Sequence, residues 1–494
     1  MSDFTALVDL ASERVGGRVL IANDEFFAPK ENLLKLDPPV WIEDKYTDCG
    51  KWMDGWETRR RRIPGFDWCV VQLGIPGVLR GVVVDTSHFR GNYPEHCSLE
   101  ACALEPDATM EELESSAAEW AEILPKSALQ GDTQNRFAIG DPHRYTHLRF
   151  NIYPDGGVAR LRVHGEAAPD WKQVLSQGAC IDLASIAHGG RVLDASDLFF
   201  GSPQDLLMPG RSLHMEDGWE TRRRRGPGHD WVVVQLGIEG VLRQVEVDTS
   251  HFKGNFPESC SLEAAGDSTA VEWKEILPRT ALRADSVHHF EIIGNTAATK
   301  VRFNIYPDGG VARLRIYGVP TREGRIAAGL CWLNSVPEKA ARALLLECCG
   351  SSAWAQRVAA GRRPFHDAEQ LFAAADTAWK KLLKDDWLEA FHHHPKIGER
   401  KAGPPSQAGR WSEQEQRSVG DSAPELLQEI ARLNQIYESR FGYIFIVCAT
   451  GKRTEEMLAL LKQRLQNDPE SEWRIAAGEQ AKITRLRLEK LLEL

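Results

Sequence analysis

The sequence contains two sets of polar residues, alike in type and order, that could bind an anion and transfer protons. An arginine fork donates two parallel charge-assisted hydrogen bonds to a carboxylate. Aspartate, glutamate and asparagine side chains pair with N–H and C=O groups, and a histidine near a carboxylate can move protons near neutral pH. The first set is Asp54, Trp56, Glu57, Thr58, Arg59, Asp85, His88, Asn92, Asp155 and Arg160, and the second is Asp217, Trp219, Glu220, Thr221, Arg222, Asp248, His251, Asn255, Asp308 and Arg313.

Both sets belong to an internal duplication. DGWETRRRR from Asp54 recurs unchanged from Asp217, and DTSHFRGNYPE from Asp85 is answered by DTSHFKGNFPE from Asp248. RFNIYPDGGVARLR from Arg149 recurs from Arg302, where the offset between the copies has become shorter by about ten residues. We place these extra residues of copy one in the acidic stretch PDATMEELESSAAEW, because a surface loop can grow at little entropic cost.

Each copy reads as β structure. WCVVQL (68–73), GVVVD (81–85) and WVVVQLG (231–237) are short β-branched runs bounded by Gly or Pro. In the hairpin around PDGG, apolar and arginine residues alternate after a turn that supplies a fixed and then a positive φ. Many short strands at this spacing predict an antiparallel sandwich or jelly roll.

The last third reads as helical. From Pro337 onward the apolar residues follow helical spacing, with a clear stripe in ELLQEIARLNQIYESRFG (425–442) and a stop at Gly442. YIFIVCATGK after it fits either a buried extended piece or a helix start. The predicted fold is therefore two tandem all-β jelly-roll sandwich domains followed by an all-α domain. The predicted boundaries are 1–170, 171–325 and 326–494.

A structural interpretation of the repeated residues is also open. Identity between the copies is what buried salt bridges and tight turns would produce after a duplication, and PDGG fits turn geometry better than catalysis. The arginine runs do not form a nucleic-acid patch, because successive side chains of a strand point to opposite faces. A net charge of −11 at pH 7 argues in the same direction, and against an anionic membrane surface.

The three repeated motifs together resemble the allantoicase family over residues 1 to 325. The resemblance implies two jelly-roll domains and conversion of allantoate to ureidoglycolate and urea. Water must then replace one ureido group on the carbon beside the carboxylate. This reaction needs a clamp for the carboxylate, a proton for the departing urea nitrogen and activation of the water.

On this resemblance, Arg59 or Arg222 is the carboxylate clamp. Proton transfer falls to His88 or His251, with Glu57 or Glu220 as the carboxylate. Further substrate contacts are expected from Asn92, Asn255, Asp155 and Asp308. Which copy carries the site, or whether both share it, is left open.

In the helical part, the conspicuous stretch is HHHPKIGER (392–400). Its adjacent histidines cannot all face one ion on a helix, where ligands need i, i+3 or i, i+4 spacing, so no metal site is predicted. Pro395 places His394 at a helix end. Glu415 lies three residues after Ser412, which also fits a capping box.

HPKIG, S-x-x-EQ, N-x-x-Y-x-x-x-FG-x-x-FIVCA and KITRLRL resemble 2-oxo-4-hydroxy-4-carboxy-5-ureidoimidazoline (OHCU) decarboxylase over residues 328 to 494. The resemblance implies a helical fold and cofactor-free loss of CO₂ that gives (S)-allantoin. It makes His394 and Glu415 the catalytic pair, and Arg487 the substrate anchor, with Arg485 as a competitor. Lys396 stands where the family motif also accepts Arg.

The two resemblances agree on a bifunctional enzyme of purine and ureide breakdown, with allantoate and OHCU as small-molecule substrates. We expect no cofactor, no nucleic-acid or membrane partner and a cytoplasmic location. Ten cysteines without any C-x-x-C spacing fit free thiols in a reducing compartment. A homo-oligomer is left open. The alternative is that the β domains are non-catalytic ligand- or carbohydrate-binding modules, but their paired His, Asp and Arg motifs argue against it.

Overall fold

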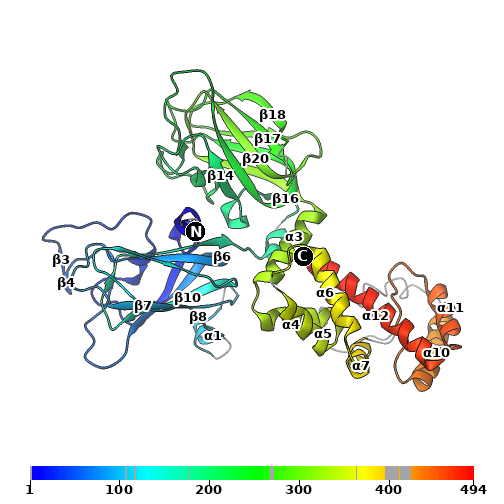
Figure 1. Ribbon diagram of the computed structural model, residues 1–494. Helices are drawn as coiled ribbons and strands as arrows, with labels where there is room; N and C mark the ends of the chain where they lie inside the picture. The colour runs from blue at the N-terminus through cyan, green and yellow to red at the C-terminus, as the bar shows by residue number, and fades with distance from the viewer. Residues whose placement is uncertain are drawn as a thin grey trace. The chain divides into compact units, whose positions relative to one another are not determined.

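The computed structural model describes residues 3–105, 108–115, 118–176, 178–267, 272–362, 364–394, 411 and 424–493 (Figure 1). The chain divides into two compact units, Met1–Gly324 and Arg325–Leu494. The first unit holds both copies of the duplication, and the second is helical. The predicted succession of two sheet-rich domains and an all-α domain is confirmed.

The first repeat consists of η1 (Phe4–Ala6), β1 (Val8–Asp9), η2 (Glu13–Val15), β2 (Arg18–Ala22), η3 (Lys30–Leu34), β3 (Tyr46–Thr47), β4 (Gly50–Lys51), β5 (Trp56–Glu57), β6 (Asp67–Asp85), β7 (His96–Cys102), α1 (Met110–Glu114), β8 (Ala121–Ala128), β9 (Gln134–Ala138), β10 (Arg144–Tyr153), β11 (Gly157–Val158) and β12 (Arg160–Ala167). After α2 (Trp171–Ser176), the second repeat consists of β13 (Ile181–Asp182), η4 (Ile186–His188), β14 (Arg191–Ala195), η5 (Pro203–Leu207), β15 (Trp219–Glu220), β16 (Asp230–Asp248), β17 (Ser259–Ala265), β18 (Lys274–Ala281), β19 (Val287–Glu291), β20 (Ala297–Tyr306), β21 (Gly310–Val311) and β22 (Arg313–Pro320).

One 19-residue strand organises each repeat: β6 in the first and β16 in the second. The first part of β6 pairs with β2 and β10, whereas its second part pairs with β9 and β12. A single strand is thus shared by two layers of a sandwich, and most of its side chains are buried. The segments WCVVQL and GVVVD, read from the sequence as separate strands, are two parts of β6.

The repeats differ by two insertions in the first. One is the predicted acidic stretch, which lies between β7 and β8 and contains α1, where the second repeat has only residues 266–273. The other was not predicted. It spans residues 36–53, contains the β3–β4 hairpin, and corresponds to the short segment 209–216 of the second repeat.

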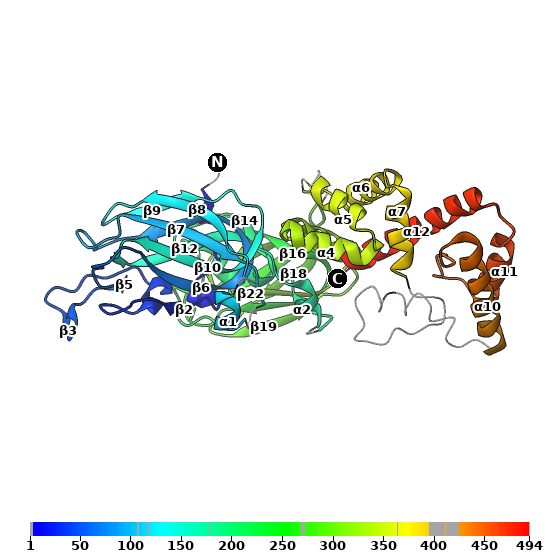
Figure 2. The ribbon, with the colours of Figure 1, turned by 90° about the horizontal axis from the view of Figure 1, so that it is seen from below.

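The helical unit consists of α3 (Arg322–Ser335), α4 (Glu338–Cys349), α5 (Ser352–Gly361), α6 (Ala368–Lys380), α7 (Lys384–His392), α10 (Pro424–Phe441), α11 (Thr454–Arg464) and α12 (Pro469–Leu492). Helix α12 packs against α4, α6 and α7 (Figure 2), and its apolar face contributes Leu488 and Leu491 to the core. Helix α10 ends before Gly442, as predicted, at a φ of 83°. The apolar run after it is a buried extended segment and not a helix start. None of the described helices is both long and apolar enough to cross a membrane.

Candidate active sites

A two-stranded sheet at one end of each β repeat presents the first predicted site residues. In the first repeat, β5 pairs with β11 of the PDGG hairpin. Along the extended chain Trp56 and Thr58 are buried, Glu57 is half-buried and Arg59 is exposed. Since side chains alternate along extended backbone, Glu57 and Arg59 face outward on the same side. The equivalent segment of β15 has the same burial pattern, so Glu220 and Arg222 are presented in the same way.

The predicted Glu and Asn of each copy are brought into contact. Asn92 Nδ2 donates to Glu57 Oε1 at 2.7 Å, and Asn255 Nδ2 donates to Glu220 Oε1 at 2.6 Å. Asn92 is held in turn by its carbonyl oxygen, which accepts from the Gly157 backbone N–H at 2.8 Å. Gly157 is required here, because a Cβ at this position would lie 1.9 Å from the Phe89 ring.

Burial raises the pKa of the Glu57 carboxyl, while the hydrogen bond from Asn92 opposes the rise. A carboxyl with a raised pKa carries its proton at a higher pH than an ordinary glutamate. Glu57 can therefore supply a proton to a leaving group at a pH where exposed carboxyls are ionised.

His88 and His251 occupy matching and unusual backbone positions. Their φ angles are 70° and 72°, in the left-handed region that is strained for a residue with a side chain. Each backbone N–H donates at 2.8 Å to an aspartate that the sequence did not single out, Asp132 for His88 and Asp285 for His251. These two bonds hold the strained residues in place.

The hydrogen-bond partner of each histidine ring determines its tautomer. His88 Nε2 lies 3.1 Å from the Pro39 carbonyl oxygen, and His251 Nε2 lies 3.0 Å from the Ser212 carbonyl oxygen. A carbonyl can only accept, so Nε2 carries the hydrogen and Nδ1 of the neutral ring keeps a lone pair. Among the described residues, neither ring bonds to Glu57 or Glu220. Each ring therefore offers a base that is separate from the carboxyl.

Arg59 has the form of an anion clamp. Its Nε donates to Asp24 Oδ2 at 2.6 Å, and its guanidinium lies 5.3 Å from the centre of the Phe26 ring. Within the described part of the chain its terminal nitrogens make no hydrogen bond, and the side chain is 63% exposed. The arginine is oriented through Nε while both terminal nitrogens can reach a carboxylate.

Arg222 repeats this arrangement with Asp197 at 2.8 Å and the Phe199 ring at 5.2 Å. These aspartates and aromatic residues are not among the site residues predicted from the sequence. A signal existed, because DEFF from Asp24 and DLFF from Asp197 share D-x-F-F at the start of both copies.

Other members of the two sets also make contacts within the framework. Asp155 Oδ2 accepts from the Arg61 backbone N–H at 2.9 Å, and Asp308 Oδ2 from the Arg224 N–H at 2.7 Å. These contacts tie the PDGG turns to the arginine runs. The buried Arg160 pairs with Asp54 at 2.7 Å.

In the helical unit, the predicted residues lie at the end of α7 and on α12. His394 follows α7 and is half-buried, whereas Arg487 on α12 is 1% exposed. Gly350, between α4 and α5, has a φ of 82°, and a Cβ there would lie 2.5 Å from His393 Cβ. The glycine therefore lets this turn pack directly against the end of α7. Glu415 and Lys396 lie outside the described residues.

The turn at Gly350 also borders the buried polar face of α12. Gln480 Nε2 donates to the Cys349 carbonyl oxygen at 3.2 Å, and burial raises the pKa of the Cys349 thiol to about 12 although the Arg487 charge opposes this. Arg485 differs from Arg487, because it is half-buried, pairs with Glu369 and Glu489, and lies over the Phe372 ring. Of the two competing arginines, Arg487 is the more deeply buried.

Polar side chains hold the extended segment 443–449 in place. Asn434 Oδ1 accepts from the Phe445 N–H at 3.1 Å, and Glu479 Oε2 accepts from the Cys448 N–H at 2.8 Å. Arg464 donates to the Ile446 carbonyl oxygen at 2.6 Å. The resemblance motif had pointed to Asn434, but Arg464 and Glu479 were missed. In the part of the chain that is described, no group of three or more His, Cys, Asp or Glu is placed to hold a metal ion.

Comparison with known proteins gives a family for each part of the chain. A family model of the allantoicase repeat matches residues 8–168 and 181–321, and the OHCU decarboxylase family matches residues 334–489. A probable allantoicase of Burkholderia mallei is 49% identical over 322 residues, which are 63% of this chain and 94% of that protein. The allantoicase of Dictyostelium discoideum is 48% identical over 62% of this chain and 86% of its own length.

The crystal structure of allantoicase from Saccharomyces cerevisiae is 36% identical, with a TM-score of 0.54, and the match covers 63% of this chain and 92% of that one. Because such relatives match both repeats along most of their own length, the alternative of non-catalytic binding modules is not favoured. The chain belongs to the allantoicase family and is a bifunctional enzyme of purine catabolism, with two allantoicase repeats followed by an OHCU decarboxylase domain.

Proposed function

We propose that the β unit hydrolyses allantoate to ureidoglycolate and urea, and that the helical unit decarboxylates OHCU to (S)-allantoin. The observation that supports the hydrolase best is the half-buried Glu57, bonded to Asn92 and presented beside the open fork of Arg59. Glu220, Asn255 and Arg222 repeat this grouping. A carboxylate, a ureido group and a leaving nitrogen each find a partner of suitable chemistry in it.

In the proposed hydrolysis, the terminal nitrogens of Arg59 bind the allantoate carboxylate. Nδ1 of His88 accepts a proton from water, and the water oxygen forms a bond with the central carbon. The carbon–nitrogen bond to one ureido group breaks, and Glu57 gives its proton to the departing nitrogen so that neutral urea leaves. Asn92 and Asp155 are the proposed contacts for the ureido N–H and C=O groups.

The same roles pass to Arg222, His251, Glu220, Asn255 and Asp308 in the second repeat. Each repeat holds the full set of residue types, so we propose one site per repeat.

In the proposed decarboxylation, Arg487 anchors the substrate while His394 and Glu415 act as the catalytic pair. The carbon–carbon bond to the carboxylate breaks near His394, its electron pair stays on the ring carbon, and one of the two residues delivers a proton there. No cofactor takes part in this scheme. The ten free cysteines fit a reducing compartment, and we propose a cytoplasmic location on that ground.

Urea release from allantoate by the full chain tests the hydrolase. The single variants Glu57→Gln and Glu220→Gln keep an acceptor for the asparagine but have no proton to give, so each should lose its own site's contribution. Urea release by the double variant should be about 10²- to 10⁴-fold slower than urea release by the wild-type chain. Urea release by the double variant at the wild-type rate would rule out the acid role of both glutamates.

The double variant is also the matched control for the other half. It should still convert OHCU to (S)-allantoin, with the hand of the product followed by circular dichroism, because the helical unit is unchanged. A racemic product at the rate seen without enzyme would exclude the decarboxylase.

A further inference from the structure

We propose that Arg14, which belongs to the first repeat, is a positioning residue of the second repeat's site. It acts by holding the segment against which the His251 ring is oriented. The inference rests on the proposed function, because it gives the second site a part that only the first repeat supplies.

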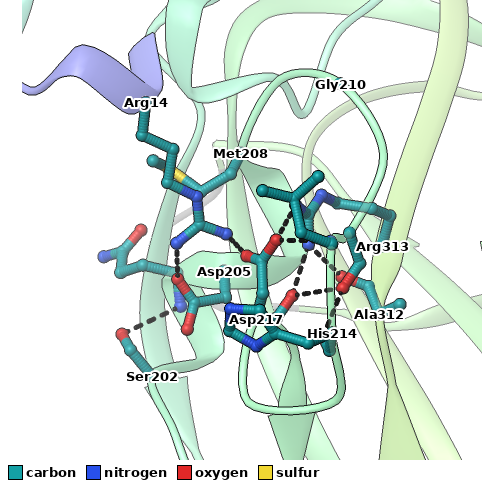
Figure 3. A network of polar contacts seen from close by, with 12 residues as sticks. Arg14, Ser202, Asp205, Met208, Gly210, His214, Asp217, Ala312 and Arg313 are labelled. Atoms are coloured by element: carbon teal, nitrogen blue, oxygen red, sulfur yellow. Dashed lines mark hydrogen bonds and ion pairs between the residues drawn. The ribbon is translucent and has the colours of Figure 1, made fainter. Parts of the chain in front are cut away.

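Arg14 lies in η2 of the first repeat and reaches two aspartates of the second (Figure 3). Its Nη1 lies 2.8 Å from Asp205 Oδ1, and its Nη2 forms an ion pair with Asp217 Oδ1. The Arg14 and Asp217 side chains are 18% and 9% exposed. Charged groups this far from solvent depend on one another, since removal of one leaves a buried charge without its counterion.

Asp217 connects this ion pair to the site. Its Oδ2 accepts from the Leu213 backbone N–H at 3.1 Å and from Arg313 Nη2 at 3.0 Å. Its own carbonyl oxygen accepts from Ser212 Oγ at 3.0 Å. The Ser212 carbonyl oxygen is the acceptor 3.0 Å from His251 Nε2. Arg14 is therefore two contacts away from the group that orients the catalytic ring.

In the first repeat, the equivalent contacts around Asp54 come from residues of that same repeat. Asp54 Oδ2 accepts from the Val40 N–H at 3.0 Å and from Arg160 at 2.7 Å, and the Pro39 carbonyl oxygen meets His88. Its additional cation is Lys35, at 3.9 Å and 46% exposed, which comes from the same repeat.

The two repeats are not interchangeable at this point. By the alignment of η2 with η4 and of η3 with η5, Arg14 corresponds to Ala187, and Lys35 corresponds to Met208. The second repeat therefore has no cation of its own at the position of Lys35. At the position of Arg14 it has Ala187, which cannot form the reciprocal ion pair with the first repeat. The dependence runs in one direction: the second site needs Arg14, and the first site does not need its counterpart.

Loss of Arg14 should disturb a buried cluster and not a surface pair. Asp205 is also in the cluster; burial raises the pKa of its carboxyl, and the charge of Arg14 opposes the rise. Without the Arg14 guanidinium, Asp205 and Asp217 lose the cation that they share, and Asp217 keeps its ion pair with Arg313 at 3.0 Å. The segment 212–213 then loses its fixed anchor, and with it the His251 ring.

The test follows the two histidines separately by NMR of full-length protein labelled at its histidine rings. His88→Gln and His251→Gln identify the two signals. Arg14→Gln should move the His251 ring signals while those of His88 stay in place. Arg14→Lys should leave the His251 signals closer to their wild-type positions. Arg136→Gln, which removes an exposed pair with Asp3 in the first repeat, should move neither. Unchanged His251 signals, or equal movement of both rings, would overturn the proposal.

Turnover gives the second readout. In a His88→Gln background, where the second site works alone, Arg14→Gln should lower kcat for urea release by roughly ten- to a hundredfold with KM changed far less, because a displaced ring reduces reactivity more than binding. An unchanged kcat would overturn the catalytic part of the proposal. Absence of urea release from the wild-type chain would instead sink the proposed function, whatever the NMR signals show.

Discussion

Asn92 donates a 2.7 Å hydrogen bond to the carboxyl of Glu57. An asparagine is a neutral partner, so it fixes the carboxyl without the strong stabilisation of the anion that an arginine would give. Elsewhere in the same repeat, the carboxylates of Asp24 and Asp54 have arginine partners, and the pKa of each is lowered. The choice of asparagine leaves Glu57 able to keep its proton, which is the property that an acid catalyst requires.

Removal of the Asn92 amide should shift the pH dependence of the first site. Burial raises the pKa of Glu57 and the Asn92 hydrogen bond lowers it, so Asn92→Leu leaves the rise unopposed. An acid catalyst loses activity as the pH rises through its pKa, and the basic limb of kcat/KM should therefore move to higher pH. The measurement is a pH series of urea release in the Glu220→Gln background. A limb that moves to lower pH, or does not move, would contradict the acid role of Glu57.

The open fork of Arg59 predicts a binding defect when its shape is changed. Arg59→Lys keeps the charge but replaces two parallel donors with one ammonium, so KM for allantoate at the first site should rise by about ten- to a hundredfold. The adjacent Arg60→Lys is the matched control, since Arg60 is exposed and points to the other side of the extended chain. Steady-state kinetics in the Glu220→Gln background would show this. Equal effects of the two substitutions would mean that Arg59 does not clamp the substrate.

The class of fold could be predicted from the alternating hairpin and the recurring motifs, but the long central strand could not. Residues 74–77 of β6 read GIPG, which is typical of a break between strands. In the structure, Gly74 and Gly77 allow close approach instead: a Cβ on Gly74 would lie 2.5 Å from Gly17 N, and one on Gly77 would lie 2.4 Å from the Glu166 carbonyl oxygen. Local sequence cannot distinguish these two uses of glycine, because the neighbours lie far along the chain.

The duplication predicted the types of site residue but not their partners. The contact of Glu57 with Asn92 depends on closure of the PDGG hairpin against the loop after β6, which no spacing in the sequence reveals. Arg14 could not be predicted from the sequence for a different reason. A search for repeated residues finds what the copies share, whereas Arg14 has an alanine as its counterpart and acts across the repeats.

A buried histidine predicts acid sensitivity of the β unit. His147 on β10 is 1% exposed, and desolvation lowers its pKa to about 4. The unfolded chain binds a proton at this residue between pH 6.5 and 4 and the folded chain does not, so stability falls as the pH drops through that window. Across this whole window, the free energy of unfolding falls by about 3 kcal/mol.

His147→Gln should therefore lose less stability than the wild type when the pH is lowered from 7 to 5, as measured by urea unfolding followed through tryptophan fluorescence. His289→Gln is the control, because the His289 side chain is 53% exposed and should leave the wild-type pH dependence unchanged. A His147→Gln variant as acid-sensitive as the wild type would show that other groups account for the effect.

Two glycines of the helical unit offer a matched pair for testing how the decarboxylase site is positioned. Gly350 and Gly442 have almost the same backbone, with φ of 82° and 83°, so an alanine at either position carries the same strain of about 1–2 kcal/mol. They differ in their surroundings: a Cβ on Gly350 would lie 2.5 Å from His393 Cβ, whereas one on Gly442 would have nothing within 4 Å.

Gly350→Ala should therefore displace the end of α7, including His394, and lower OHCU decarboxylation much more than Gly442→Ala does. Urea release from allantoate should be unaffected in both variants, because the substitutions lie in the helical unit. Equal losses of decarboxylation would mean that backbone strain alone explains the defect and that the contact with His393 does not position the site.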